Sequence, residues 1–438
     1  MRHFFLFFLI GFTLSVTAQP EEKAVKSGFS LLQALLEKNG EKAFSYIDSS
    51  VHDKIRPSDL STIWRQVELG LQLGKYLDTQ GYLYEAPNLF IGLEFEKGPV
   101  DLKVSFAEGG GIRGFFFEAP TDKTPYRIPA YADTSLFSEH SYSLQSGLYS
   151  LPGKLCIPKG KGPFPLVILS HGSGPNDMDE KMGPNRVFRD IAYGLASQGI
   201  AVYRFHKRTH VYGIYSAKNM NVLTVKEEYL DDLYAAIDTL SQHQQIDPEQ
   251  LFLMGHSLGA ILAPRVALGS GKLKGIILAA APGQPMDSLV LYQLEYLNTL
   301  DSSGTYYRGL IEYQSEVAYL RSPEFSLESE TNWLPMQLNA YYWMDMLQYN
   351  VTDSLLKYPG HALILQAEDD YQVPNGEYLR WQNELGKRKR TYYASFPGLG
   401  HGFFSSGGRK GPEQYEHYSP VSPEVITRLR HFILKNAN

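Results

Sequence analysis

A serine stands between two glycines in the segment LFLMGHSLGAILAP, which covers residues 251–264. Ser257 lies where one short apolar run, expected to be a strand, ends and a second apolar run, expected to be a helix, begins. A serine on such a turn is strained, so its neighbours must be small. The first turn of the following helix would direct backbone N–H groups at a negatively charged oxygen. The pattern therefore predicts that Ser257 is a nucleophile.

A serine hydroxyl becomes a good nucleophile only when a histidine takes its proton, and an acid must orient that histidine. With a serine on this kind of turn, the acid and the histidine follow it in that order along the chain. His401 lies between two glycines, and Glu368, Asp369 and Asp370 follow the expected strand HALILQA. Asp370 directly precedes Tyr-Gln-Val-Pro, the usual position of the acid, and Asp369 is the alternative. We expect Ser257, Asp370 and His401 to form a catalytic triad.

A second run of small residues could complete the site. The apolar run PLVILS leads into His-Gly-Ser-Gly-Pro at residues 171–175, where the backbone can approach a substrate closely. We expect the backbone N–H groups of Ser173 and Leu258 to form an oxyanion hole. One such donor stabilises the transition state by roughly 3 kcal/mol.

A basic segment, RFHKRTH at residues 204–210, follows another expected strand. His206 is a candidate for contact with the substrate; the alternative is a solvated loop whose charges pair with nearby acids. His206 and His210 have no third ligand at matching spacing, so we expect no metal site and no cofactor. Three aromatic residues in a later segment are candidates to line a substrate pocket or simply to pack: Tyr341, Tyr342 and Trp343.

These residues need a scaffold, and the chain from about residue 141 onward has the pattern of one. Short apolar runs such as IAVYRF and GIILAAA alternate with amphipathic segments. This alternation indicates a parallel sheet covered by helices on both faces. Residues 284–360 interrupt it with a segment rich in Tyr, Leu and Trp, too long for a plain connection. We expect a helical cap there.

The first part of the chain has a different pattern of apolar residues. Apolar residues at helical spacing over 27–75 precede alternating strand-like runs over 80–118, which indicates a small α+β domain. Residues 119–140 lack periodicity and are expected to hold the linker. We therefore expect an N-terminal domain over 19–125 and an α/β domain over 126–438.

Residues 1–18 carry an early arginine, an apolar run and small residues, the pattern of a secretory signal peptide. We expect an exported chain, periplasmic or extracellular, without a stable membrane anchor. The net charge of −6 gives no basic face for nucleic acid, and the single cysteine, Cys156, cannot form an intrachain disulfide. Nothing in the composition indicates an oligomeric state.

Four motifs, HGSGPND, GHSLG, AEDDYQVP and GHGF, together resemble the bacterial α/β-hydrolase esterases of the EstD type. The resemblance covers nearly all of the mature chain. It implies an α/β-hydrolase fold with a DUF3887-like N-terminal domain, for which an NTF2-like cone is one expectation. It also implies a carboxylesterase for short acyl esters, with Ser257, Asp370 and His401 as nucleophile, acid and base. His206 departs from the family pattern, in which an Asp is common.

The expected function is a secreted serine esterase acting on a small-molecule ester. Two alternatives stay open: an exopeptidase or amidase of the S33 or S9 type, and a non-catalytic binding protein on a hydrolase fold. No acidic clamp for a free amine is evident, which disfavours the exopeptidase. A complete triad in the required order disfavours the binding protein.

Overall fold

The computed structural model describes residues 21–437 except 54, 71, 72, 86, 108, 119 and 121–125. The chain divides into two compact units, Met1–Pro125 and Tyr126–Asn438. The expected signal segment, residues 1–18, lies outside the described residues. Within those residues, no helix combines the length and the apolar character needed to cross a membrane.

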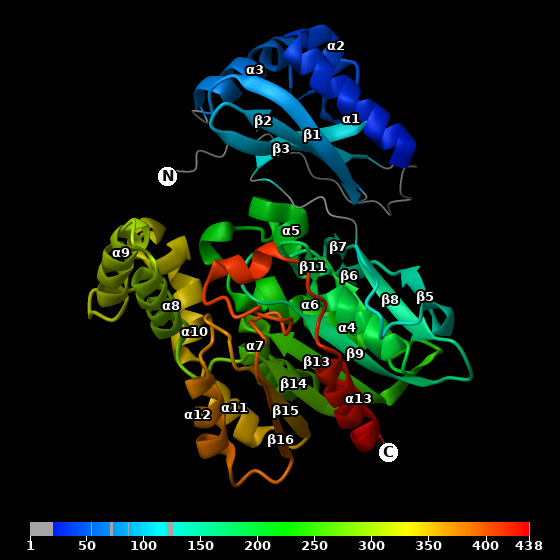
Figure 1. Ribbon diagram of the computed structural model, residues 1–438, viewed down its shortest axis with the longest axis vertical. Helices are drawn as coiled ribbons and strands as arrows, with labels where there is room; N and C mark the ends of the chain where they lie inside the picture. The colour runs from blue at the N-terminus through cyan, green and yellow to red at the C-terminus, as the bar shows by residue number, and fades with distance from the viewer. Residues whose placement is uncertain are drawn as a thin grey trace. The chain divides into compact units, whose positions relative to one another are not determined.

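In the described part of the first unit, helices pack against an antiparallel sheet, which Figure 1 shows in blue and cyan. Alternate residues of one strand, such as Leu89 and Ile91, are buried in a core shared with Leu31 and Leu35 of the first helix. This period of two is the pattern of a strand with one face on a core. The sheet order is β1-β2-β3-β4. The elements are α1 (Glu21–Leu36), α2 (Gly40–Phe44), η1 (Ser49–Val51), α3 (Pro57–Gly70), β1 (Tyr76–Glu85), β2 (Asn88–Phe95), β3 (Gly98–Phe106) and β4 (Ile112–Glu118).

The second unit is built on an eight-stranded sheet, counted over the described part of the chain, in the order β16-β15-β14-β13-β9-β12-β8-β5. Neighbouring strands run parallel except that β8 is antiparallel to both of its neighbours. The strands are β5 (Phe137–Ser141), β8 (Gly153–Pro158), β9 (Phe164–Ser170), β12 (Ala201–Phe205), β13 (Ile246–His256), β14 (Gly275–Ala279), β15 (His361–Ala367) and β16 (Thr391–Phe396). Two small hairpins accompany it, β6 (Leu144–Ser146) with β7 (Tyr149–Leu151) and β10 (Lys181–Met182) with β11 (Asn185–Arg186).

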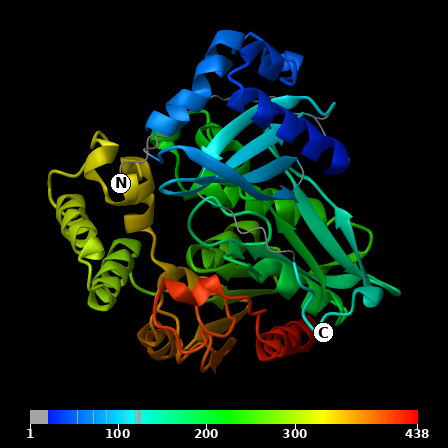
Figure 2. The same ribbon diagram turned by 45° about the horizontal axis from the view of Figure 1, so that its top comes forward.

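Helices cover both faces of this sheet, which is visible in both views (Figures 1 and 2). Successive residues of β13 alternate between two cores: Leu253 packs in the core of α6 and α7, and Phe252 in the core of α4 and α13. The prediction of a mostly parallel sheet covered on both faces is therefore confirmed. The covering helices are α4 (Val187–Ala196), α6 (Asp231–Leu240), α7 (Leu258–Ser270), α12 (Asn375–Leu385) and α13 (Pro423–Ala437).

The segment between β14 and β15 is helical. Its helices are α8 (Met286–Leu300), α9 (Thr305–Leu320), α10 (Ala340–Gln348) and α11 (Val351–Lys357). Figure 1 shows α8 and α9 as a yellow-green pair beside the sheet rather than on either of its faces. We call residues 284–360 the cap segment.

Part of the expected linker belongs to the fold. The prediction of a linker is wrong for residues 126–140, because Tyr126 donates a hydrogen bond to Asp190 at 2.9 Å and β5 pairs with β8 at the edge of the sheet. An edge strand has one paired side and needs only a few apolar contacts. Its sequence, FSEHS, therefore lacks the apolar run of a central strand.

Candidate active site

The expected catalytic residues follow the carboxyl ends of three parallel strands of the eight-stranded sheet. Ser257 follows β13, Asp370 comes three residues after β15, and His401 comes five residues after β16. Gly255 of β13 pairs with Ser170 of β9, so the loop after β9 starts beside Ser257. Carboxyl ends of parallel strands meet at one edge, the usual position of a site in an open α/β sheet.

Ser257 occupies a strained turn between β13 and α7. Its backbone has φ 52° and ψ −118°, a conformation that costs a non-glycine residue about 1–3 kcal/mol. A Cβ at Gly255 would lie closer than 3.0 Å to backbone atoms of Gly259. A Cβ at Gly259 would lie closer than 3.0 Å to the backbone of His171. Both glycines are therefore required by close backbone approach, as expected for a nucleophile on this turn.

Asp370 and His401 contact each other in the interior. Asp370 Oδ2 and His401 Nδ1 are 2.7 Å apart, and the two side chains are 0% and 3% exposed. Asp370 Oδ1 accepts two backbone N–H groups, from Gln372 at 2.8 Å and Val373 at 2.9 Å. Three nitrogen groups thus lie within hydrogen-bond distance of one carboxylate. The contact at Nδ1 leaves Nε2 as the ring nitrogen that can serve the serine.

The two acids that precede Asp370 accept hydrogen bonds from serine side chains. Asp369 accepts a hydrogen bond from Ser406 Oγ at 2.6 Å, and Glu368 accepts one from Ser395 Oγ at 2.7 Å. Of the three acids in the AEDD segment, Asp370 is the one whose carboxylate contacts His401.

The loop after β9 lies directly against the serine. A Cβ placed on Gly172 would be 3.3 Å from Ser257 Cβ. The N–H of Gly172 donates to Glu180 Oε1 at 2.6 Å, so it is not available to a substrate. Among the described residues, the N–H groups of Ser173 and Leu258 have no acceptor. These two donors remain open, as an oxyanion hole requires.

His256, which directly precedes Ser257, contacts the loop that carries His401 and lies beside Glu180, which contacts the loop after β9. Its Nε2 lies 2.9 Å from the carbonyl oxygen of His401, and its Nδ1 lies 3.2 Å from Glu180 Oε1. Burial by itself would lower the pKa of His256, but the Glu180 carboxylate and the His401 carbonyl outweigh burial and raise it. Burial would likewise raise the pKa of Glu180, and His256 outweighs it so that this pKa is lowered. Both shifts favour a charged pair.

The buried amine of Lys207 contacts the loop after β9, which also carries Ser173. Lys207 Nζ donates to the carbonyl oxygen of Gly174 at 2.8 Å and lies 2.7 Å from Glu228 Oε1. Tyr229 donates its hydroxyl proton to the carbonyl oxygen of Gly172 at 2.6 Å. The expectation of a solvated loop is wrong for residues 204–208, because Arg204, Lys207 and Arg208 are almost fully buried. Their charges are nevertheless paired with acids, as that alternative supposed: Arg204 with Asp179 and Glu139, and Arg208 with Asp232.

The residues expected to contact the substrate differ in their burial and in their contacts. His206 accepts a hydrogen bond from the Met178 N–H at 3.0 Å and stacks on His210, with 4.8 Å between ring centroids. Tyr342 and Trp343 are buried, and they donate to Glu228 at 2.8 Å and to the Pro335 carbonyl at 3.0 Å. The structure thus favours packing, not substrate contact, for both residues. Tyr341 is 38% exposed.

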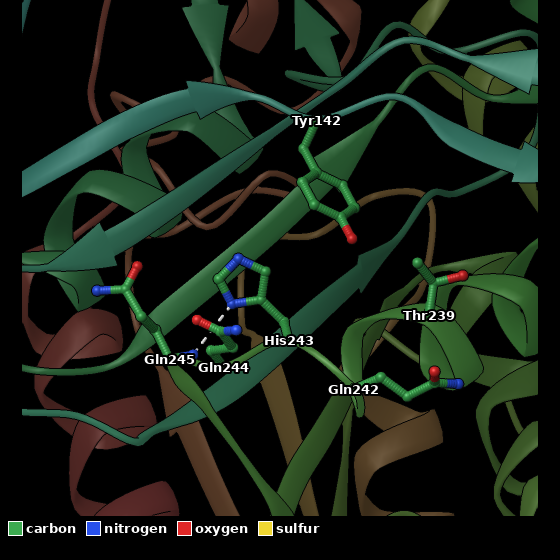
Figure 3. Close-up of a pocket in the computed structure, with 6 residues that line it drawn as sticks. All are labelled: Tyr142, Thr239, Gln242, His243, Gln244 and Gln245. Atoms are coloured by element: carbon green, nitrogen blue, oxygen red, sulfur yellow. Dashed lines mark hydrogen bonds between the residues drawn. The ribbon is translucent and has the colours of Figure 1, made fainter.

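One pocket lies away from this edge. It has a volume of about 510 Å³ and polar walls, formed by Tyr142, Thr239 and residues 242–245 (Figure 3). Its loop precedes β13, whereas Ser257 follows β13, so a strand length of roughly 30 Å separates the pocket from the serine.

Sequence reasoning did not identify Glu180, His256 or Lys207 as site residues. Acidic residues follow the loop after β9 at positions 177, 179 and 180, and nothing in the sequence indicates which of them contacts that loop. The signal for Lys207 is its place in a basic segment, two residues after the end of β12.

Comparison with known proteins places the chain in a family. Residues 167–409 match the alpha/beta hydrolase family. The chain is 32% identical over 416 residues to Esterase EstD of Thermotoga maritima, covering 94% of this chain and 95% of that protein. This match confirms the resemblance to esterases of the EstD type.

Solved structures with a more distant likeness to this chain are also found. Est1E of Butyrivibrio proteoclasticus is 17% identical with a TM-score of 0.45, covering 68% of this chain and 98% of that one. An esterase of Pyrococcus furiosus is 14% identical with a TM-score of 0.45, covering 73% of this chain and 98% of that one. On the extent of the family match and of the identity to Esterase EstD, the chain belongs to the alpha/beta hydrolase family.

Proposed function

We propose that the chain is a serine hydrolase that cleaves carboxylic esters of small molecules through an acyl-enzyme on Ser257. The observation that carries the proposal is the buried contact of Asp370 with His401 at the sheet edge where the strained Ser257 turn lies. The identity to Esterase EstD over 94% of the chain supports an ester as the substrate.

In the proposed reaction, Ser257 Oγ attacks the ester carbonyl carbon while His401 Nε2 takes the hydroxyl proton. The N–H groups of Ser173 and Leu258 bind the carbonyl oxygen as it becomes negative. Asp370 stabilises the charged imidazole. The bond to the leaving alcohol then breaks, and His401 returns the proton to the alcohol oxygen. Water attacks the acyl-enzyme by the same route, which releases the acid and restores Ser257.

A short acyl group is the proposed preference, in keeping with the resemblance. We expect kcat/KM for p-nitrophenyl esters to be highest at acetate or butyrate and to fall toward dodecanoate. A maximum at long chains would contradict this preference.

The reaction type is tested by labelling with a fluorophosphonate, which phosphonylates an activated serine. We expect one labelled peptide, containing Ser257, and loss of esterase activity in proportion to labelling. Amino-acid amides turned over as fast as short esters would instead support an amidase. Absence of labelling together with absence of ester turnover would support a binding protein.

We also propose that the chain is exported, on the pattern of residues 1–18. Amino-terminal sequencing of the protein recovered outside the cytoplasm is expected to begin at Gln19. A recovered chain that retains residues 1–18 in the cytoplasmic fraction would contradict export.

A further inference from the structure

Two buried polar side chains, those of Glu180 and His256, connect the loop after β9 that carries Ser173, here called the oxyanion loop, to the loop after β16 that carries His401, the His401 loop. Glu180 Oε1 accepts the N–H of Gly172 at 2.6 Å and lies 3.2 Å from His256 Nδ1. The other nitrogen of that ring, Nε2, lies 2.9 Å from the carbonyl oxygen of His401. A continuous series of polar contacts therefore connects the loop that carries Ser173 to the loop that carries the proposed base, His401. We call this series the path.

The fold alone does not require this path. Glu180 and His256 are 2% and 1% exposed, and two buried charges cost several kcal/mol of desolvation that apolar residues of similar size would avoid. Glu180 also has a φ of 45°, a left-handed conformation that is uncommon for a residue with a side chain. Its second oxygen, Oε2, has no hydrogen-bond partner among the described residues. The pair is therefore retained at a cost to stability.

We propose that Glu180 and His256 are positioning residues that hold the oxyanion loop and the His401 loop in register about Ser257. This inference rests on the proposed function, since it assigns a role within the same site. Glu180 accepts the Gly172 N–H and so holds the loop at the residue before Ser173, while Tyr229 binds the carbonyl oxygen of Gly172 in the same peptide plane as the Ser173 N–H. His256 holds the backbone of His401, and its charge offsets a carboxylate that would otherwise repel a developing oxyanion.

The first test compares two substitutions at Glu180. Glu180→Gln keeps an oxygen at the position of Oε1, which accepts the Gly172 N–H and faces His256 Nδ1, so kcat should stay within about tenfold of wild type. Glu180→Leu removes both contacts, and kcat for p-nitrophenyl butyrate should fall by about 100-fold, as for a displaced oxyanion donor. KM should change little, because the lost interaction is made in the transition state.

A matched control lies one residue away. Asp179 is also an inward-facing acid, but its carboxylate is paired with Arg204 at 2.6 Å and does not contact Gly172 or His256. Asp179→Asn should lower the melting temperature and leave the kcat of the folded enzyme within about twofold of wild type. A kcat for Glu180→Leu within threefold of wild type, or an equal loss in Asp179→Asn, overturns the proposal.

Should Glu180→Leu fail to fold, His256→Asn decides the question. It leaves the Gly172 contact in place and removes the donor to the His401 carbonyl. We expect the fluorophosphonate labelling rate at Ser257 to fall by about tenfold or more, since the base is displaced. An unchanged rate overturns the proposal.

Ser257→Ala separates this inference from the proposed function. A fully active Ser257→Ala enzyme defeats the proposed function itself. An inactive Ser257→Ala enzyme beside a fully active Glu180→Leu enzyme defeats the positioning role alone.

Discussion

At the scale of single residues, the environment of one carboxylate decides the assignment of the acid. Asp370 faces an imidazole and two backbone N–H groups, whereas Asp369 faces the hydroxyl of Ser406. An amide at 370 would offer the histidine a donor in place of an acceptor and favour the wrong tautomer.

Asp370→Asn should therefore lower kcat for p-nitrophenyl butyrate by about 10⁴-fold with an intact fold. Asp369→Asn is the matched control, since an amide oxygen still accepts from Ser406, and its kcat should stay within about threefold of wild type. Steady-state kinetics on both purified variants make the comparison. The reverse order of effects would assign the acid to Asp369.

The sequence predicts the residues whose local pattern reports their role. Ser257 is marked by flanking glycines that close backbone approach requires, and Asp370 by its place before Tyr-Gln-Val-Pro. Glu180 and Lys207 carry no such mark, because their roles come from contacts with Gly172 and Gly174 made across the fold. Trp343 looks like a pocket residue in sequence and is buried in structure, because aromatic side chains serve both purposes.

At the scale of elements, the junction of β13 and α7 has no room for a side chain at its second glycine. Gly259→Ala would press a methyl group against the carbonyls of His171 and Ser170. We expect a loss of about 1–3 kcal/mol in the free energy of unfolding, as for overpacking, measured by urea denaturation.

A helical glycine in the cap segment is the control. A Cβ at Gly309 of α9 would meet no atom within 4 Å. Gly309→Ala should raise the free energy of unfolding by about 0.5–1 kcal/mol, because alanine loses less entropy in a helix. Stabilisation by Gly259→Ala as well would show that the junction is looser than the contacts indicate.

The cap segment gives a second prediction at this scale. Trp343 of α10 is buried and its Nε1 donates to Pro335, so Trp343→Phe should cost about 2 kcal/mol of stability. KM for p-nitrophenyl butyrate should not change. A tenfold change in KM with unaltered stability would instead place Trp343 in contact with the substrate.

The central strands could be predicted because burial on both faces leaves a continuous apolar run, as in PLVILS and HALILQA. The edge strand β5 could not be predicted, because its sequence is polar. The residues before it contact the fold through isolated aromatic side chains such as Tyr126, which form no periodic pattern in the sequence. The cap segment was recognisable by its length and composition, whereas the contacts of each of its aromatic residues depend on the folded packing.

At the scale of the whole molecule, Asp190 connects distant parts of the second unit. It accepts hydrogen bonds from Tyr126 at 2.9 Å and from the Val421 N–H at 3.0 Å. Burial raises the pKa of its carboxyl from 3.8 to about 7, against the opposing effect of those two donors. The folded state therefore binds this proton more tightly than the unfolded state.

This linkage fixes the sign of a pH dependence. The contribution of Asp190 is most favourable below pH 3.8 and declines as the pH rises toward about 7. Asp190→Asn, which keeps one acceptor and one donor, should remove this decline, so its stability relative to wild type should increase between pH 4.5 and 7.5. Denaturation at several pH values measures it, with the exposed Asp238→Asn as control. A parallel pH dependence in wild type and Asp190→Asn would contradict the raised pKa.

The most direct test of acyl transfer at Ser257 is the turnover of p-nitrophenyl butyrate by Ser257→Ala. The variant removes the attacking oxygen and leaves the backbone donors of the hole in place. Ser270→Ala, at the other end of α7, is the matched control. We predict that kcat falls by roughly 10⁴- to 10⁶-fold in Ser257→Ala and is unchanged in Ser270→Ala. A Ser257→Ala enzyme with wild-type kcat would contradict the account.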